Sequence, residues 1–405
     1  MDLVSGTPFW VVRDGPSDPY PALTTDASAE IVVIGAGITG ALAAYELTLA
    51  GADVIVLERD EVASGSSSAT SGLLMYDTDA SLEDLTRRFG PERASSVYRC
   101  GLEAISRIEE LCATLGDSGF SRRPSMYLAS SEKDAEGLET EFRLRREHGF
   151  HVEWFAREKL ESQYSFTAPA ALRSHGGEID CYRFARRLLA AAHAHGARIY
   201  ANSPVTDFKW VGSGGVEVIV AGDRIVRASR AIGATGYELA THLDRPTGNL
   251  ASTWIFATEP LDSFDGWDDR CLIWETARPY LYIRSTDDGR LLIGGYDEPW
   301  AEEHRSRPRY EEKTRTLFER ARRMFPRLRL DIAYSWAGTF ATTDDGLPFI
   351  GAVDECPGMW FALGYGGNGL TFSVIAANIL TAMYRGERPP EAELFSFNRP
   401  GVRRT

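Results

Sequence analysis

The feature that most constrains this fold is a set of three glycines with the spacing G-x-G-x-x-G. Gly35, Gly37 and Gly40 directly follow a β-branched strand pattern and directly precede a helix-forming run at 41–50. A second buried-strand pattern follows at 53–58. A strand, a tight glycine turn, a helix and a second strand together predict a β-α-β unit with parallel strands and a right-handed crossover.

Each glycine of this motif has a physical role in holding a dinucleotide. The first makes the tight turn, the second lets a pyrophosphate approach the backbone, and the third lets helix and strand pack closely, with the phosphates on the helix N-terminus. Glu58 ends the second strand, where an acid accepts hydrogen bonds from ribose hydroxyls and repels the 2′-phosphate of NADP. The alternative is a glycine-rich turn in a parallel-sheet protein that binds nothing. The motif alone does not separate NAD from FAD.

Three further segments favour FAD. A serine-rich run at 61–74 suits the wrapping of a pyrophosphate, and a second glycine turn follows a strand pattern at 231–239. The segment 358–380 has the pattern of a strand, a glycine-rich loop and a helix. A helix that begins near Leu370 would direct its positive end at the negative charge of a reduced flavin. An NAD-dependent dehydrogenase would leave this last segment unexplained.

Composition limits the remaining possibilities. The 405 residues suggest two or three domains, and the formal net charge of −14 argues against a nucleic-acid or anionic-membrane partner. Five widely spaced cysteines without a CxxC pair indicate reduced thiols rather than disulfides or a zinc site. The N-terminus lacks the pattern of a signal peptide, and no apolar stretch is long enough to span a membrane. We therefore expect a cytoplasmic protein with no membrane span, no nucleic-acid partner and no metal.

The rest of the chain alternates helix and strand patterns. Helices are expected at 83–115, 134–148, 182–195, 309–325 and 371–385, and strands at 125–130, 151–156, 224–239 and in several runs between 252 and 295. Residues 1–28 are expected to form an arm without regular structure of its own. Phe9, Trp10 and Tyr20 are expected to pin this arm to the body, since a purely solvated arm would seldom carry such residues.

These motifs together give the chain a resemblance to the D-amino-acid oxidase/glycine oxidase/sarcosine oxidase (DAO) family of FAD-dependent amine oxidoreductases. The resemblance is carried by VVIGAGITG, VIVLERD, SGSSSATSG, AIGATG, GLPFIG and GYGGNGLTFS, which lie between residues 31 and 373 in the family's order. The arm is similar to that of bacterial members related to gamma-glutamylputrescine oxidase. The resemblance implies an α/β fold with a Rossmann-type, glutathione-reductase-like FAD-binding domain and a second, α+β substrate domain on a mostly antiparallel sheet.

The implied domains are discontinuous along the chain. After the arm at 1–28, the FAD-binding domain takes 29–90, 165–250 and 335–405, and the substrate-binding domain takes 91–164 and 251–334. The resemblance also places the cofactor residue by residue: the pyrophosphate on Gly35, Gly37, Ile38, Thr39 and Gly40; the adenosine ribose on Glu58 and Arg59; the phosphates and inner flavin on Ser66, Ser67, Thr70, Ser71 and Leu73; adenine on Val205; the closing turn on Thr235 and Gly236; and the flavin pyrimidine edge on Gly366, Gly367, Asn368, Gly369 and Leu370.

Three places depart from the family pattern. Phe340 and Ala341 stand near the position of an Arg-Pro pair whose arginine grips the substrate carboxylate in amino-acid-oxidising members. Gly338 stands at the flavin, about where sarcosine-oxidase-like members attach flavin through a cysteine, so we expect non-covalent FAD. Leu292 stands where those members place a lysine for oxygen activation. The lack of this lysine makes a quinone or another protein an alternative to oxygen as the expected electron acceptor.

Another base could still hold a carboxylate. Tyr280, Tyr282 and Arg284 share one strand face by the period of two, and Arg278 precedes a proline in the preceding turn. The alternative is a surface arginine flanked by two core tyrosines. His175 is a further candidate for the cavity, although a lone histidine is more often structural.

The resemblance implies chemistry without a dedicated acid–base pair. Flavin accepts a hydride from the carbon that bears a neutral amine, and Tyr282, Tyr365 or Trp336 would form an aromatic wall that holds the amine. The expected substrate is a small-molecule amine or amino acid, oxidised at its C–N bond to an imine that hydrolyses. Two alternatives stay open: a 2-hydroxy acid or polyamine conjugate as the substrate, and a flavin-binding subunit that is active only with a partner.

Overall fold

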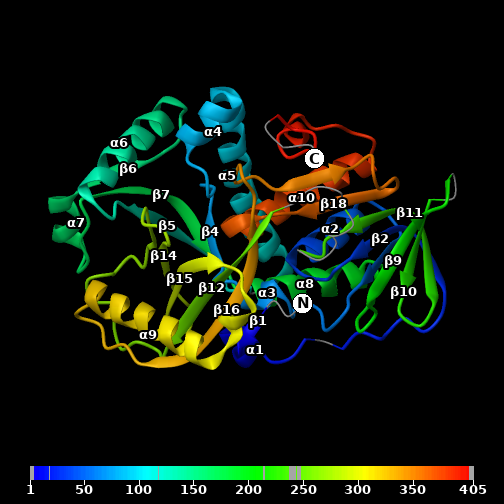
Figure 1. The fold of residues 1–405 in the computed structure, drawn as a ribbon, viewed down its shortest axis with the longest axis horizontal. Helices are drawn as coiled ribbons and strands as arrows, with labels where there is room; N and C mark the ends of the chain where they lie inside the picture. Colours follow the sequence, from blue (N-terminus) through cyan, green and yellow to red (C-terminus); the bar gives the residue numbers. More distant parts are fainter. Residues whose placement is uncertain are drawn as a thin grey trace.

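A computed structural model describes residues 4–17, 19–116, 118–212, 215–236, 243 and 248–400. In these ranges the chain forms two sheets with helices packed on and around them. Figure 1 shows the larger sheet on the left and the smaller sheet on the right, with the chain passing between them several times. The α/β fold with two domains, predicted from the glycine motif and the family resemblance, is confirmed.

The smaller sheet is built on the predicted β-α-β unit. β2 (Ala27–Ile34) pairs in parallel with β3 (Val54–Leu57), and α2 (Ile38–Leu49) connects them. The strand order is β17-β18-β11-β2-β3-β8, with β10 and β9 continuing from β11. The other members are β8 (Arg198–Tyr200), β9 (Val205–Trp210), β10 (Val216–Val220), β11 (Arg224–Gly233), β17 (Phe349–Ala352) and β18 (Met359–Leu363). All four residues of β3 are buried, which explains its continuous apolar sequence.

The larger sheet is antiparallel except where β13 pairs with β5. Its strand order is β1-β16-β12-β15-β14-β13-β5-β7-β4, and β6 pairs with β7. The strands are β1 (Val4–Gly6), β4 (Leu73–Met75), β5 (Ser121–Leu128), β6 (Glu153–Ala156), β7 (Ala170–Glu178), β12 (Asn249–Thr258), β13 (Leu272–Glu275), β14 (Leu281–Ser285), β15 (Leu291–Pro299) and β16 (Ile332–Thr342). Strands β7 and β16 belong to this sheet although their residues fall mainly in stretches predicted for the FAD-binding domain; the division of the chain into domains stays a prediction.

The remaining helices are α3 (Ser66–Ala69), α4 (Leu82–Phe89), α5 (Pro91–Leu115), α6 (Glu132–Glu147), α7 (Arg157–Gln163), α8 (Cys181–Ala194), α9 (Arg307–Met324) and α10 (Gly369–Tyr384), with 3₁₀ turns η3 (Glu302–Arg305), η4 (Gly366–Asn368) and η5 (Pro390–Glu393). The predicted helices lie close to their expected positions, whereas the short helices α3 and α7 were not predicted. The single helix predicted at 83–115 is wrong in one respect, because Gly90 separates α4 from α5. Helices α8 and α10 pack on α2, and α9 contacts β12 and β15.

The N-terminal arm has regular structure, which corrects the prediction. β1 pairs with β16, and α1 (Phe9–Asp14) follows. Phe9 and Trp10 are fully buried, which confirms that they pin the arm. Tyr20 is half-buried against the core.

The topology brings the functional segments to one edge of the smaller sheet. β2, β3, β11 and β18 run parallel, so the loops after their carboxyl ends meet at the same edge. β11 ends at Gly233, and the last residues of the strand predicted at 224–239 lie outside the described residues. Within the described ranges, no helix combines the length and apolar character needed to cross a membrane.

Candidate cofactor and substrate site

A cavity of about 400 Å³ lies where the loops of the smaller sheet meet the larger sheet. Every cofactor-binding residue predicted from the sequence lines this cavity except Gly40. Of the predicted catalytic residues, Tyr280, Tyr282 and Tyr365 line it, whereas Arg284 and Trp336 do not. The cavity therefore joins segments from the two ends of the chain, as the motifs predicted.

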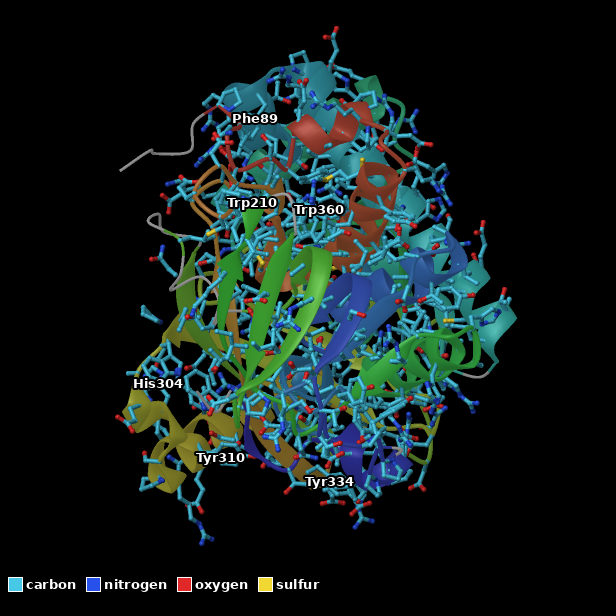
Figure 2. All side chains as sticks on the ribbon, turned by 90° about the vertical axis from the view of Figure 1, so that its right-hand side faces the viewer. Phe89, Trp210, His304, Tyr310, Tyr334 and Trp360 are labelled. Atoms are coloured by element: carbon cyan, nitrogen blue, oxygen red, sulfur yellow. The ribbon has the colours of Figure 1, made fainter. Side chains whose placement is uncertain are left out.

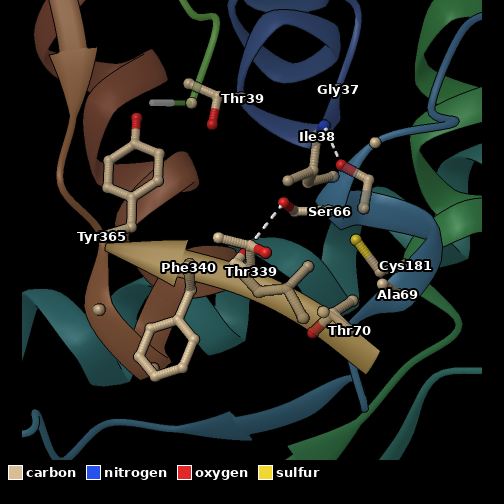
Figure 3. Close-up of a pocket in the computed structure, with 18 of the residues that line it drawn as sticks. Gly37, Ile38, Thr39, Ser66, Ala69, Thr70, Cys181, Thr339, Phe340 and Tyr365 are labelled. Atoms are coloured by element: carbon tan, nitrogen blue, oxygen red, sulfur yellow. Dashed lines mark hydrogen bonds between the residues drawn. The ribbon is translucent and has the colours of Figure 1, made fainter. Parts of the chain in front are cut away.

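The first end of the cavity is the glycine turn at the start of α2. Ser67 Oγ accepts a hydrogen bond of 2.8 Å from the backbone N–H of Ile38, which ties the serine-rich segment to this helix N-terminus (Figure 3). A Cβ atom on Gly40 would overlap the carbonyl of Gly35, so Gly40 allows close packing of helix and strand and does not itself reach the cavity. Free N–H groups at a helix N-terminus and small side chains suit a pyrophosphate.

Glu58 is held rigidly beside this turn. One carboxylate oxygen accepts from the N–H of Ala36 at 2.7 Å and the other from the N–H of Asp60 at 3.0 Å. Burial raises the pKa of Glu58, against the lowering effect of these two hydrogen bonds. The carboxylate lines the cavity at the end of β3, where the sequence placed the ribose hydroxyls.

The opposite end is the glycine loop before α10. The Asp79 carboxylate accepts from the N–H of Gly367 at 2.9 Å, and Asn368 Nδ2 donates to the carbonyl of Asp77 at 2.5 Å. These two bonds fix the loop against the segment that follows β4. Helix α10 begins at Gly369, which agrees with the helix start predicted near Leu370 and points its positive end at the cavity.

Aromatic side chains surround the space next to this loop. Tyr280 and Tyr282 lie with ring centroids 5.9 Å apart, and Figure 3 shows Phe340 and Tyr365 on the same side of the cavity. Burial raises the pKa of both Tyr280 and Tyr282 well above the ordinary value, so both phenols stay neutral. Trp274 completes the aromatic lining. Neutral rings of this kind suit an amine by cation–π contact.

The charges at this end are unequal. Asp77 and Asp79 line the cavity, and Asp79 opens onto it. Arg278 also lines it, from an exposed position, with its guanidinium 5.2 Å from the Tyr280 ring centroid. Enclosure by the protein raises the pKa of Asp79, against the lowering effects of the Gly367 N–H and of Arg278. This end of the cavity is therefore acidic and aromatic, with one arginine.

A buried ion-pair network supports this wall from behind. Arg145 forms ion pairs with Asp77 and with Glu141, the second with an Nε–Oε1 distance of 2.8 Å. Both carboxylates are almost fully buried. Glu141 also accepts from the N–H groups of Leu82 and Glu83 at the start of α4. The position of Asp77 at the cavity is thus tied to α4 and α6.

Arg284 does not line the cavity. Its side chain is 1% exposed and donates to the carbonyls of Ser71, Gly72, Ile179 and Ser285. Tyr282 faces the cavity, as the alternation of side chains along the strand predicted. Arg284 lies further along the same strand, past the cavity edge, where other backbone segments cover it.

Three other predicted positions lie outside the cavity. Trp336 is fully buried and donates from its indole N–H to the carbonyl of Ala69 at 2.8 Å. Leu292 is buried but does not line the cavity, and no lysine is among the described residues that do. His175 is exposed on β7, with its ring 5.2 Å from that of His151.

Strand β16 contacts the cavity near its end. Gly338, Thr339 and Phe340 line the cavity, whereas the next residue, Ala341, is buried elsewhere. The loop after β16 carries Asp344 and Asp345, neither of which lines the cavity. Asp345 is held by Arg399 through two hydrogen bonds of 2.7 and 2.9 Å.

Several lining residues were missed by sequence reasoning. They are Asp77, Asp79, Thr253, Ile255, Trp274 and Cys181. The DTD sequence at 77–79, directly after the serine-rich segment, was an available signal. Burial raises the pKa of the Cys181 thiol strongly, so this thiol stays protonated and is a poor nucleophile. We therefore still expect FAD to be held without a covalent bond. Among the described residues, no group of three His, Cys, Asp or Glu side chains is arranged to hold a metal ion.

Comparison with known proteins gives a consistent result. Residues 30–383 match the family model DAO, "FAD dependent oxidoreductase". Relatives include the probable oxidoreductase OrdL of Haemophilus influenzae (25% identical, covering 91% of this chain and 85% of the relative) and gamma-glutamylputrescine oxidoreductase of Escherichia coli (24%, covering 91% and 86%). A third is glycine oxidase of Geobacillus kaustophilus (27%, covering 85% and 89%).

Solved structures agree on the fold. Glycine oxidase from Geobacillus kaustophilus superimposes with a TM-score of 0.79 at 20% identity, covering 92% of this chain and 99% of that one. L-proline dehydrogenase from P. horikoshii superimposes with a TM-score of 0.76 at 18% identity, covering 92% and 97%. The glycine turn at α2, the acid at the end of β3 and the α10 loop fit the pyrophosphate, the ribose and the flavin of FAD. The chain belongs to the DAO family and is an FAD-dependent oxidoreductase.

Proposed function

We propose that this enzyme oxidises the C–N bond of a small amine or amino acid. The observation that carries the proposal is the acidic and aromatic end of the cavity, where Asp79, Tyr280, Tyr282 and Phe340 meet the glycine loop. An amine approaches as a cation, so a carboxylate and aromatic faces favour it. Relatives named gamma-glutamylputrescine oxidoreductase, glycine oxidase and dimethylglycine dehydrogenase support an amine as the substrate.

The protein's part in the reaction is positioning and charge stabilisation. The bound ammonium group must lose a proton to solvent before oxidation, because only the neutral amine can give up a hydride. FAD, when bound, supplies the acceptor for that hydride from the carbon next to the nitrogen. Tyr280, Tyr282 and Phe340 would hold that carbon close and exclude water. The N-terminus of α10 and the N–H groups of its loop would stabilise negative charge at the loop. The imine that leaves the site hydrolyses in water.

A carboxylate on the substrate would meet Arg278. Arg278 lines the end of the cavity near Tyr280 and is exposed, so a carboxylate bound by it would lie toward solvent. This position of Arg278 favours an amino acid, or a longer amine with a remote carboxylate, as the substrate. The electron acceptor is oxygen, a quinone or another protein, and the absence of a lining lysine among the described residues favours the last two.

The test is anaerobic reduction of the purified yellow protein by a panel of amines, amino acids and 2-hydroxy acids. Bleaching of the flavin bands by amines supports the proposal, and readmission of air then measures reaction with oxygen. Bleaching of the flavin bands only by 2-hydroxy acids would contradict the proposal and indicate that the enzyme oxidises a C–O bond. A protein that nothing bleaches until a partner is added would be the partner-dependent subunit.

A variant sharpens this test. Asp79→Asn keeps the size of the side chain and its acceptor for the N–H of Gly367 but removes the charge. Loss of a charged contact worth about 1.5–3 kcal/mol raises KM for the amine roughly 10- to 100-fold. The control is Asp354→Asn, an exposed acid that does not line the cavity. An unchanged KM in Asp79→Asn would contradict the assigned role.

A further inference from the structure

Four successive backbone carbonyls beside the flavin end of the cavity all accept hydrogen bonds from side chains distant in sequence. The carbonyl of Ala69 accepts from the indole of Trp336 at 2.8 Å, and that of Thr70 from the indole of Trp10 at 2.8 Å. The carbonyls of Ser71 and Gly72 accept from Arg284 Nη1 at 3.1 and 3.0 Å. We call residues 69–72 the carbonyl segment.

The three donors lie outside the cavity, whereas the carbonyl segment borders it. Ala69, Thr70 and Ser71 line the cavity, whereas Trp10, Trp336 and Arg284 do not. Figure 3 shows Ala69 and Thr70 among the lining residues. The carbonyl oxygens are therefore turned away from the space that FAD fills. Carbonyl dipoles aimed into that space would repel the pyrophosphate and the negative charge of the reduced flavin. Holding them outward leaves hydroxyl and N–H groups toward the cofactor.

One of these donors belongs to the N-terminal arm. Trp10 is fully buried, and the guanidinium groups of Arg284 and Arg13 lie 5.4 and 5.0 Å from its ring centroid. Arg13 in turn forms ion pairs with Asp180 at the start of α8 and with Asp287 in the turn after β14.

The arm is also fastened to the larger sheet. Strand β1 pairs with β16, and Val4 lies opposite Gly338, which lines the cavity. Figure 2 shows Tyr334 beside α1, and its ring centroid is 5.5 Å from that of Phe9. None of the described residues 4–17 lines the cavity. Any effect of the arm on FAD must therefore act through neighbouring segments that line the cavity, namely the carbonyl segment, β16 and the start of α8.

We propose that Trp10 is a positioning residue of the FAD site and that the N-terminal arm is part of the cofactor-binding apparatus. The indole N–H fixes the carbonyl of Thr70, and its ring holds Arg284 against the carbonyls of the next two residues. Release of the arm frees the carbonyl segment to turn its oxygens inward. FAD then binds more weakly and experiences a different electrostatic field. This inference concerns FAD binding and stands independently of the substrate class.

The test compares two tryptophan-to-phenylalanine variants. Trp10→Phe keeps a ring but loses the N–H donor. Trp267→Phe is the matched control, because Trp267 is equally buried and donates from its indole to the carbonyl of Cys271 at 3.0 Å, away from the cavity. Trp10→Phe leaves the buried carbonyl of Thr70 without its donor, so this variant should bind FAD about tenfold more weakly than wild type. Trp267→Phe should bind FAD within about twofold of wild type. Quenching of flavin fluorescence measures both affinities.

Two readouts separate positioning from general destabilisation. Trp10→Phe should shift the visible flavin bands and the reduction potential, whereas Trp267→Phe should change only the melting temperature of the apoprotein. Equal effects of both variants on FAD affinity, or none from Trp10→Phe, would overturn the proposal.

A second measurement needs no variant. By thermodynamic linkage, if opening of the arm weakens FAD binding tenfold, FAD must suppress that opening tenfold. Hydrogen exchange of the amides at 9–14 should therefore slow about tenfold when FAD binds the wild-type apoprotein, although these residues do not line the cavity. If FAD slowed amide hydrogen exchange at 66–72 but not at 9–14, the role of the arm would be refuted, even if Trp10→Phe fails to fold.

Discussion

Arg284→Met gives the sharpest test of the site, because the sequence suggested a substrate-binding role and the structure places this side chain elsewhere. Arg284 donates to four backbone carbonyls and is almost fully buried. At about 1 kcal/mol for each lost hydrogen bond, the variant loses about 4 kcal/mol of folding free energy. A chain of 405 residues has an unfolding entropy of about 0.85 kcal/mol/K, so the melting temperature should fall by about 5 °C.

The assay has two parts. Thermal unfolding of the FAD-loaded protein, followed by release of flavin fluorescence, measures the stability loss. The ratio of kcat/KM for an amino acid to kcat/KM for the amine without the carboxylate measures carboxylate recognition. This ratio should be unchanged in Arg284→Met, since Arg284 does not reach the cavity. It should fall in Arg278→Met, which removes the arginine at the cavity mouth.

The opposite pattern would refute the reasoning. A carboxylate clamp loses its substrate discrimination when its arginine is removed, by about a hundredfold or more, with little effect on folding. If Arg284→Met kept its melting temperature and lost activity only on carboxylate-bearing substrates, the arginine would be a clamp. The observed bonds to backbone carbonyls would then be absent in the working enzyme.

Three further results are expected. Arg399→Met strands a buried Asp345 carboxylate, so the melting temperature should fall by about 4–6 °C in calorimetry, and Asp345→Asn in the same background should recover part of it. Burial raises the pKa of Asp297 to about 6, so the stability that its neutral form contributes is complete below about pH 4 and is lost as the pH rises through 6. The melting temperature of Asp297→Asn, measured relative to wild type, should therefore rise by about 3 °C between pH 4 and 7. A difference that stays constant over this pH range would contradict the prediction. A Cβ atom on Gly294 would overlap the Tyr282 ring, so Gly294→Ala should lower kcat/KM at least about tenfold at unchanged FAD affinity, and unaltered kinetics would exclude a role for that ring.

The placement of the predicted cofactor residues around one cavity could be foreseen because it depends on local structure. Gly35 and Gly37 lie there because of a turn between one strand and one helix, and Glu58 lies there because the next strand ends beside that turn. Such relations need only the β-α-β unit, which short-range patterns specify. The α10 loop was found for the same reason, since its glycines directly precede the helix.

The substrate half depends on distances that periodicity does not contain. The period of two placed Tyr282 and Arg284 on one face, but one residue advances a strand by about 3.4 Å, and two residues were enough to leave the cavity. Trp336 and Gly338 are likewise two residues apart on β16, and Gly338 lines the cavity whereas Trp336 does not. Asp79 could not be placed from the sequence pattern because its position is set by a hydrogen bond to Gly367, 288 residues further along the chain.

The pairing of β18 with β11 has a consequence for the synthesis of the protein. β18 and the α10 loop come from the last part of the chain, yet they complete a sheet and a cavity that begin with β2. A nascent chain still held in the ribosome at Met359 would have its phosphate-binding turn outside but no wall for the flavin. The complete FAD site therefore cannot form until β18 and the α10 loop have left the ribosome, and a chain terminated before them would lack that wall.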